Sequence, residues 1–229
     1  MYRHYKAVTL VTLLLIMASV FAAEAAPPAE LNRAQQLMFI KDHLQGVFKG
    51  SCLNYNFSSV TKGAESFTDK IKVTVTDVVG ESQRNLEFDF LSGPHHIDFS
   101  PAVGYTGNPV IIHFMERDIS RMSRDSGGSN SYFRNRIRDS FKQPTEIRDI
   151  KITFDGKEVN GTEVVVTPFI ADPNAVTNFK MYIHKRYEIT FSDQVPGGIY
   201  RIHTVVPDEN GKSASIDEAM TFQKLTPAS

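Results

Sequence analysis

The residues best suited to chemistry are histidines and carboxylates in and just beyond a Gly/Pro-rich loop. His-His-x-Asp within the loop and His-x-x-Glu on the predicted helix after it could assemble a metal site with nitrogen and oxygen ligands. No His-Glu-x-x-His motif accompanies them, so surface loop histidines and a partly buried helical histidine are the simpler interpretation. A metal-dependent hydrolase is thus the second alternative function. Its five candidate ligands are His95, His96, Asp98, His113 and Glu116.

Other catalytic constellations lack their defining motifs. There is no Gly-x-Ser-x-Gly elbow of a serine hydrolase, and the glycines in the run 126–129 are not followed by the Gly-Lys-Ser/Thr of a phosphate loop. A glycosidase pair could be chosen from Glu87, Asp89, Glu116 and Asp118, but many chains offer such carboxylates. We therefore assign no catalytic residue and expect no cofactor.

The first 25 residues have the three-part pattern of a secretory signal peptide. A basic n-region, MYRHYK, precedes an apolar stretch over residues 7–22 and the small-residue motif Ala23-Glu24-Ala25. The apolar stretch is shorter than the ~20 residues of a membrane span. The sequence predicts a signal peptide over 1–25, export to the periplasm, and no transmembrane segment after cleavage.

Composition narrows the class of the remaining chain, residues 26–229. Its only cysteine, Cys52, cannot form an intramolecular disulfide, so the fold must depend on an apolar core. The formal net charge of the full 229-residue sequence, −1, argues against a nucleic-acid partner. We expect a single domain over 26–229 with a helical insertion at 107–142.

The insertion is predicted to form a helical hairpin. Asn108 is placed to cap the first helix and Pro109 to occupy its first position, which predicts a helix over about 109–124. The Ser126-Gly127-Gly128 break ends this helix, because glycine readily adopts positive φ. Ser129 or Ser131 can then cap the second helix.

Each helix of the hairpin carries one apolar stripe and several basic residues. The apolar members recur at helical spacing, and they are Ile111, Met115, Ile119, Met122, Phe133, Ile137 and Phe141. Arginines of the second helix could meet a phosphate or an acidic partner, because guanidinium pairs with phosphate in a bidentate fork. They are Arg134, Arg136 and Arg138. A solvated charged surface is the competing interpretation, and the pairing of Asp118 with Arg121 fits such a surface.

The rest of the chain alternates with a period of two, as in Leu53-x-Tyr55-x-Phe57, after one amphipathic helix over 30–44. The sequence predicts a loop over residues 92–108, and Asp172-Pro173-Asn174 is predicted to interrupt the strand pattern. Seven or eight strands with one apolar face predict an α+β fold. Its sheet is a curved antiparallel one, an incomplete β-barrel, whose concave face is covered by the N-terminal helix and the central helical hairpin.

This order of leader, helix, strands, helical insertion and strands resembles that of the Lol-type periplasmic carriers of lipoproteins. The stretches GNPVIIHFMERDISRM, SYFRNRIRDSF and YEITFSDQVPGGIYRIHTVVP are also similar to exported proteobacterial proteins of unassigned activity. The resemblance implies an apolar cavity, between half-barrel and lid helices, that receives acyl chains.

Three hypotheses follow. The first is a non-catalytic periplasmic binding or carrier protein for an acyl chain, lipid or lipoprotein, in which the seven apolar residues of the hairpin line the cavity and the three arginines form a basic rim. The alternative is an envelope protein-interaction domain with a filled core, which would dock a protein partner. The second alternative is the metal-dependent hydrolase.

Overall fold

A computed structural model describes residues 30–228 of the chain. Its strands form a single antiparallel sheet of nine strands in the order β4-β3-β2-β1-β9-β8-β7-β6-β5. The strands are β1 (Cys52–Thr61), β2 (Phe67–Val79), β3 (Gln83–Phe90), β4 (Ala102–Tyr105), β5 (Glu146–Phe154), β6 (Lys157–Val166), β7 (Arg186–Phe191), β8 (Ile199–Pro207) and β9 (Ala214–Thr226). The two outer strands, β4 and β5, do not pair with each other, so the sheet is an open, incomplete barrel.

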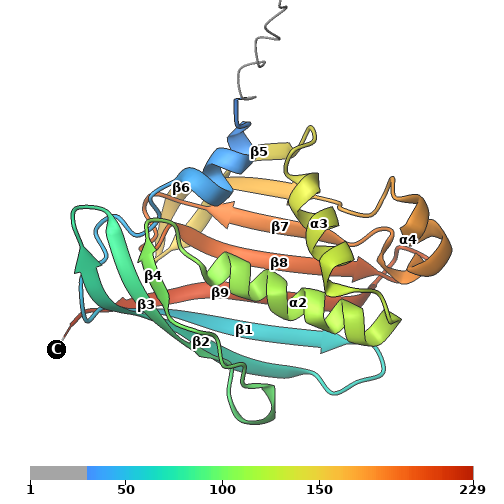
Figure 1. The fold of residues 1–229 in the computed structure, drawn as a ribbon, viewed down its shortest axis with the longest axis horizontal. Helices are drawn as coiled ribbons and strands as arrows, with labels where there is room; N and C mark the ends of the chain where they lie inside the picture. Colours follow the sequence, from blue (N-terminus) through green and yellow to red (C-terminus); the bar gives the residue numbers. More distant parts are fainter. Residues whose placement is uncertain (1–29, 229) are drawn as a thin grey trace, which may run out of the picture. The chain divides into compact units, whose positions relative to one another are not determined.

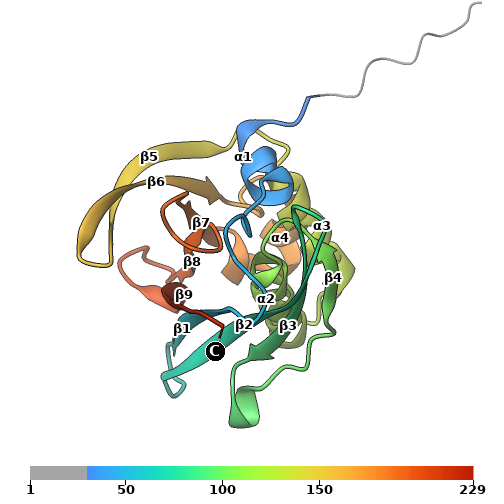
Figure 2. The ribbon, with the colours of Figure 1, turned by 90° about the vertical axis from the view of Figure 1, so that its left-hand side faces the viewer.

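The described chain contains the helices α1 (Arg33–Gln35), the π-helix η1 (Gln36–Ile40), the 3-10 helix η2 (Gly93–His95), α2 (Val110–Ser126), α3 (Asn130–Ser140), α4 (Pro173–Asn178) and the 3-10 helix η3 (Lys180–Tyr182). Of these, α1, α2 and α3 lie on the concave side of the sheet (Figures 1 and 2). The predicted α+β fold, with a curved antiparallel sheet under an N-terminal helix and a central helical hairpin, is confirmed.

The connectivity explains why α2 and α3 cover the sheet. The chain leaves the sheet at one edge, β4, and must reach the opposite edge, β5, before it can continue. Helices α2 and α3 make this crossing over the concave face, and Figure 1 shows α2 lying along β1, β8 and β9. A connection that spans the mouth of a half-barrel is placed by topology to act as its cover.

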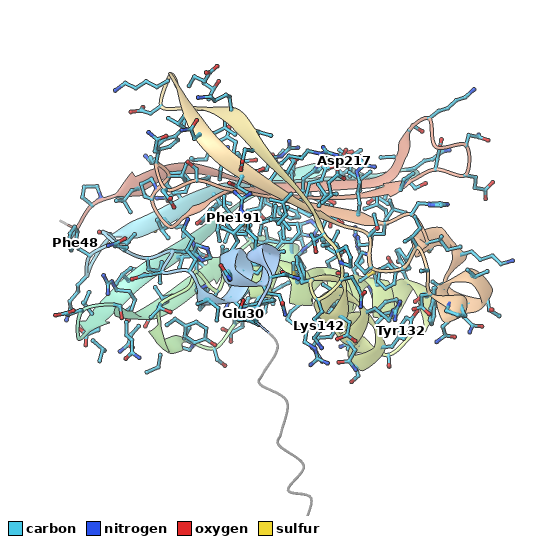
Figure 3. The ribbon with its side chains drawn as sticks, turned by 90° about the horizontal axis from the view of Figure 1, so that it is seen from above. Glu30, Phe48, Tyr132, Lys142, Phe191 and Asp217 are labelled. Atoms are coloured by element: carbon cyan, nitrogen blue, oxygen red, sulfur yellow. The ribbon has the colours of Figure 1, made fainter. Side chains whose placement is uncertain are left out.

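The alternating pattern of the strands sorts their side chains by face. On β1, Leu53, Tyr55 and Phe57 each expose at most 1% of their surface, whereas Cys52 and Asn54 are only half-buried. Cys52 therefore lies on the opposite face from the core, as its register predicts. The buried residues of the concave face merge with those of the helices into one apolar core (Figure 3).

The hairpin turn follows its predicted signals closely. The Oδ1 of Asn108 accepts a hydrogen bond from the Val110 N–H at 3.2 Å, although the helix itself starts one residue later than Pro109. Gly127 ends α2 in the left-handed region, with φ of 74°. The Ser129 hydroxyl, rather than that of Ser131, accepts from the Tyr132 N–H and caps α3.

Several predicted boundaries are wrong. The N-terminal helix is shorter than residues 30–44, because its last turn widens into η1 and Lys41 turns extended, with ψ of 135°. The loop predicted at 92–108 contains η2 and the short edge strand β4. The strand count is nine in the described chain rather than seven or eight.

One predicted break is the start of a helix. Asp172 accepts a hydrogen bond from the Asn174 N–H, and Pro173 occupies the first position of α4. An acidic cap followed by proline is a standard helix start, since proline lacks the N–H that the first turn leaves unpaired. The signal peptide predicted over 1–25 lies outside the described residues.

Candidate functional site

The pair α2 and α3, hereafter the lid, carries the predicted apolar stripe on its inner side. The seven stripe residues each expose no more than 8% of their surface. Phe133 packs against the rings of Phe169, Phe179 and Tyr182, with centroids 5.9, 5.2 and 6.0 Å apart. Full burial of such a side chain contributes about 1.5 to 3 kcal/mol, so the stripe attaches the lid to the rest of the core.

The space between the lid and the sheet is filled by side chains. Five clefts of the described chain lie at its surface, and none of them is lined by a stripe residue. No backbone hydrogen bond among residues 30–228 joins α2 or α3 to a strand. The lid is therefore held to the sheet by side-chain contacts alone.

Asn108 anchors the start of the lid. Its Nδ2 donates to the Tyr55 hydroxyl at 2.9 Å and to the Gly197 carbonyl at 3.0 Å. The Asn108 N–H donates to Nδ1 of His43, whose ring stacks on Phe191 at 5.5 Å. Through its side chain, Asn108 connects the first turn of α2 to β1 and to the turn before β8. Through its backbone N–H, it connects the same turn to the N-terminal segment.

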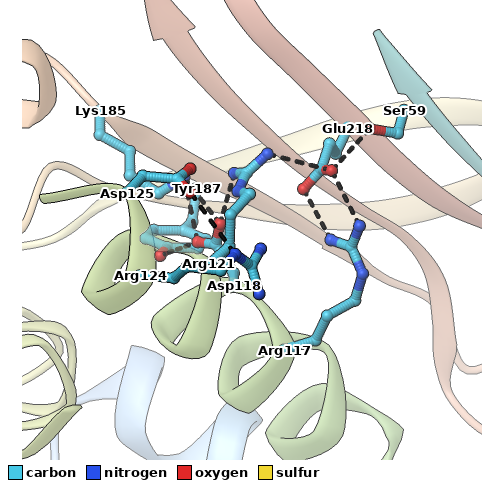
Figure 4. A network of polar contacts seen from close by, with 9 residues as sticks. All are labelled: Ser59, Arg117, Asp118, Arg121, Arg124, Asp125, Lys185, Tyr187 and Glu218. Atoms are coloured by element: carbon cyan, nitrogen blue, oxygen red, sulfur yellow. Dashed lines mark hydrogen bonds and ion pairs between the residues drawn. The ribbon is translucent and has the colours of Figure 1, made fainter. Parts of the chain in front are cut away.

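Beneath α2 lies a buried cluster of charged and hydroxyl side chains, here termed the α2 ion cluster (Figure 4). Its members come from the inner side of α2, from β1, β7 and β9 and from the residue before β7. They are Ser59, Arg117, Asp118, Arg121, Lys185, Tyr187 and Glu218. Burial of charge is costly unless each group is paired and hydrogen-bonded, so an arrangement like this requires specific geometry.

Asp118 is the centre of one half of the α2 ion cluster. Its Oδ1 accepts from Nη2 of Arg121 at 2.6 Å, and its Oδ2 lies 3.0 Å from Nζ of Lys185 and accepts from the Tyr187 hydroxyl. Burial alone would raise the pKa of Asp118, but Lys185 and Arg121 outweigh it and lower the pKa to about 2. The same burial, with Asp118 beside it, raises the pKa of Tyr187. Asp118 is thus a carboxylate and Tyr187 a neutral donor at physiological pH.

Glu218 is the centre of the other half. It exposes 1% of its surface and lies opposite Ser59 in the β1–β9 ladder, from which it accepts a hydrogen bond at 2.7 Å. Its two oxygens accept from the two terminal nitrogens of Arg117 at 2.9 and 3.1 Å. Nη1 of Arg121 lies 3.0 Å from Oε1 of Glu218, so Arg121 joins the two halves. The cluster therefore fixes α2 to both β7 and β9.

The α2 ion cluster holds more positive than negative charge. Three cationic side chains, Arg117, Arg121 and Lys185, face two carboxylates, Asp118 and Glu218. Burial shifts the pKa of Lys185 downward, and the neighbouring Asp118 carboxylate opposes this shift. Arg121 retains its charge, since the neighbouring carboxylates outweigh burial and raise its pKa. An excess of cationic groups against carboxylates distinguishes this site from a balanced salt bridge.

Charged residues at inward positions of the apolar pattern are the sequence signals for this cluster. Asp118 comes seven residues after Ile111 and four before Met122, which puts a carboxylate in the middle of the apolar stripe. The prediction that Asp118 and Arg121 form a surface pair is wrong: the pair exists, but Asp118 is fully buried. Glu218 fills an inward position of β9, at the same spacing of two as the buried Ile216 and Met220, and so interrupts an apolar face.

The three predicted rim arginines lie on the outer side of α3. Arg134 donates to both oxygens of Glu116 at 2.6 Å, and Nε of Arg136 lies 2.9 Å from Asp172. Arg138 is 59% exposed, and its nearest carboxylate is 3.8 Å away. Carboxylates already neutralise two of these arginines, and their role in binding stays a prediction.

The predicted metal ligands are engaged elsewhere. The ring of His95 stacks on Phe67 at 3.8 Å, and that of His113 lies between Phe88 and Phe99 with centroids 4.2 and 4.1 Å apart. Within residues 30–228, no group of three or more His, Cys, Asp or Glu side chains is arranged to hold a metal ion. The hypothesis of a metal-dependent hydrolase therefore has no site in the described chain. The five candidates were His95, His96, Asp98, His113 and Glu116.

No helix of the described chain is long and apolar enough to cross a membrane.

Comparisons with known proteins give a weak resemblance of layout. No family model and no curated protein matches the sequence. Among solved structures, LprF from Mycobacterium bovis is similar at 12% identity and a TM-score of 0.32, over 86% of this chain and 94% of LprF. A LolA superfamily protein, NE2245 from Nitrosomonas europaea, is similar at 10% identity and a TM-score of 0.27, over the same shares, 86% and 94%.

Proposed function

We propose that this protein is an exported, periplasmic binding or carrier protein without catalytic chemistry. It holds an acyl chain, a lipid or the acylated end of a lipoprotein between the apolar stripe of the lid and the concave face of the sheet. One observation carries the proposal: the lid covers an apolar interior and is held there by side chains alone. Acyl chains can replace apolar contacts of this kind without the loss of any backbone hydrogen bond.

Because the interior is filled, binding requires the lid to move. A ligand shifts a closed protein toward an open one only by as much as it prefers the open form. The stripe provides that preference, since its apolar area, exposed on opening, is covered again by the ligand.

A matched pair of substitutions on α2 tests the proposal. Met115 belongs to the stripe and is 8% exposed, whereas Ile112 faces outward and is 45% exposed. Met115→Gln keeps the length of the side chain but puts an amide against the acyl chain, and we expect about tenfold weaker uptake of a fluorescent diacylglycerol. Ile112→Gln is the control and should bind like the wild type.

The measurement is a fluorescence titration of delipidated protein, with circular dichroism of each variant to establish folding. Native mass spectrometry of the purified protein adds an independent readout, because a carrier should retain extractable lipid. A wild-type chain that takes up no diacylglycerol and carries no lipid would remove the carrier proposal. An equal loss of diacylglycerol uptake in both variants would show that the stripe is not the binding surface.

The filled interior also favours the alternative, an envelope protein-interaction domain. In that case the stripe is a permanent core, and α2 amides should stay protected from hydrogen exchange in the presence of diacylglycerol. For a carrier, the same amides should exchange at a different rate once ligand is bound, because the lid has moved. Hydrogen exchange of α2 therefore separates the two functions.

A further inference from the structure

A small basic cleft lies beside α2, and none of its lining residues belongs to the apolar stripe. It has a volume of about 290 Å³ and is formed between α2 and residues 94–97, which include the end of η2. The polar side chains that line it are His95, His96, Arg117, Ser120, Arg121 and Arg124. No carboxylate is among the lining residues, so every ionisable group at the cleft surface is basic.

The carboxylates nearby do not cancel this charge. Arg117, Arg121 and Lys185 face Asp118 and Glu218 in the α2 ion cluster, on the inner side of the helix. Arg124 adds a fourth cation, and its nearest carboxylate, Asp125, is 3.6 Å away. Three arginines therefore line the cleft, whereas the carboxylates that pair with them, Asp118, Glu218 and Asp125, are not among its lining residues. An anion is the ligand that such a surface attracts.

Arg121 supplies a second, independent observation. Its side chain lines the cleft although the residue is only 8% exposed, and its Nε has no hydrogen-bond acceptor among residues 30–228. A buried donor without an acceptor is unfavourable, which is why such groups usually face a ligand or an ordered water. An unpartnered guanidinium N–H beside a basic cleft points to an oxygen-bearing anion.

The opposite wall is held in place by aromatic and backbone contacts. His95 stacks flat on Phe67, with an interplanar angle of 1°, and Nδ1 of His96 lies 3.2 Å from the carbonyl oxygen of Leu91. This wall is therefore positioned before any ligand arrives, which reduces the entropic cost of binding.

We propose that this cleft binds a phosphate-type oxyanion, held by Arg124 at the entrance and by Arg117 and Arg121 at its base. Guanidinium groups suit this role because they pair with phosphate oxygens in a planar, bidentate manner. The anion competes with Glu218 for the two inner arginines, so its binding loosens the contact between α2 and β9. The anion is either free phosphate or the head group of a phospholipid. The proposal goes beyond the proposed function, because the cleft can bind an anion whether or not the lid accepts an acyl chain.

The test is a titration of the full chain with sodium phosphate, followed by NMR of the arginine Nε–Hε signals, against sodium chloride at the same ionic strength. We expect saturable shifts with phosphate and none with chloride. Arg124→Gln should raise the Kd for phosphate about fivefold, because one exposed charge-assisted contact is lost. Lys151→Gln is the control: it removes one exposed, loosely paired positive charge from β5, and should leave the Kd unchanged.

A second arm identifies the source of the anion. Dihexanoylphosphatidic acid that binds more tightly than phosphate would assign the cleft to a lipid head group, and equal affinities would assign it to free phosphate. Absence of saturable binding by either probe would overturn the proposal, as would an equal effect of Arg124→Gln and Lys151→Gln. Uptake of uncharged diacylglycerol is independent of this result, so failure here and failure of the carrier proposal are distinguishable.

Discussion

Asp118 on α2 and Lys185, the residue before β7, form an ion pair of 3.0 Å in which both side chains are fully buried. Lys185 comes from a segment 67 residues further along the chain. The pair therefore joins the lid to the segment that leads into β7. The free energy of this contact depends on both partners being present.

Loss of Lys185 alone should be strongly destabilising. Lys185→Met keeps much of the side-chain volume but leaves Asp118 with fewer partners in a buried site, and we expect a loss of about 3 kcal/mol in the free energy of unfolding. Urea denaturation followed by circular dichroism measures it. Lys72→Met is the matched control, because Lys72 pairs with Asp89 at 3.2 Å with half-exposed side chains, and such pairs contribute about 0 to 1 kcal/mol. Similar losses of unfolding free energy in both variants would show that the buried pair contributes no more to stability than an exposed pair.

The stability of the protein should fall as the pH drops from about 6.5 toward 4. Burial lowers the pKa of His43 to about 4, with the charge of Lys41 as a second cause, and burial likewise lowers the pKa of His113 to about 4. Below pH 6.5 the unfolded chain binds protons at these positions and the folded chain does not. The stabilising contribution of the neutral rings is therefore complete above pH 6.5 and is lost as the pH falls.

His113→Phe provides the test of this pH dependence. Phenylalanine can take the place between Phe88 and Phe99 without a titrating group, so the variant should lose less stability than the wild type between about pH 7 and pH 5. Urea midpoints at the two pH values give the comparison. His184→Gln, at an exposed position, should show the wild-type difference. If the urea midpoint of His113→Phe changes between the two pH values as much as that of the wild type, His113 does not contribute to the pH dependence of stability.

The sheet and the lid were predictable because their signals are local. Alternation at Leu53, Tyr55 and Phe57 and the glycine after Ser126 each specify a conformation within a few residues. Strand β4 was missed because its four residues, 102–105, contain a glycine at φ of 73° and lack any run long enough to show a period. The pairing of β1 with β9, at opposite ends of the chain, is a long-range contact that no local pattern encodes.

The α2 ion cluster could be predicted only in part, for a physical reason. A charge at an inward position, such as Asp118 or Glu218, is visible in the sequence as an exception to the apolar period. The partner of Asp118 cannot be recognised in the sequence. Lys185 lies outside every helix and strand, and it comes close to Asp118 only when the chain has folded. The apolar stripe needed no partner to be recognised, and its burial is evident in the structure.

The turn between α2 and α3 should tolerate no side chain at Gly128. A Cβ built there would lie 2.7 Å from Phe133 and 2.8 Å from Phe179, both in the packed aromatic group beneath α3. Gly128→Ala should therefore cost about 1 to 3 kcal/mol through overpacking. Gly107→Ala is the control, since its nearest neighbour would be at 3.8 Å, and the thermal midpoint should hardly change. If the two alanine variants have the same midpoint, the rings beneath the turn are free to move.

Neutralising Glu218 should release α2 without unfolding the sheet. Glu218→Gln removes one of the two carboxylates that face Arg117, Arg121 and Lys185, so the excess of buried positive charge rises. We expect amide hydrogen exchange in α2 to accelerate about tenfold or more, because a buried charged contact of about 1.5 to 3 kcal/mol is weakened.

Amides of β1 and β8 report whether the opening in Glu218→Gln is local. They should exchange at nearly the wild-type rate if α2 lifts while the sheet remains paired, since local and global opening differ in which amides they expose. Glu163→Gln on β6 is the matched control, because that carboxylate pairs with Arg148 at 3.3 Å and belongs to no contact of the lid. Equal acceleration across α2, β1 and β8 would mean that the lid opens only with global unfolding, and a carrier whose lid moves separately would then be excluded.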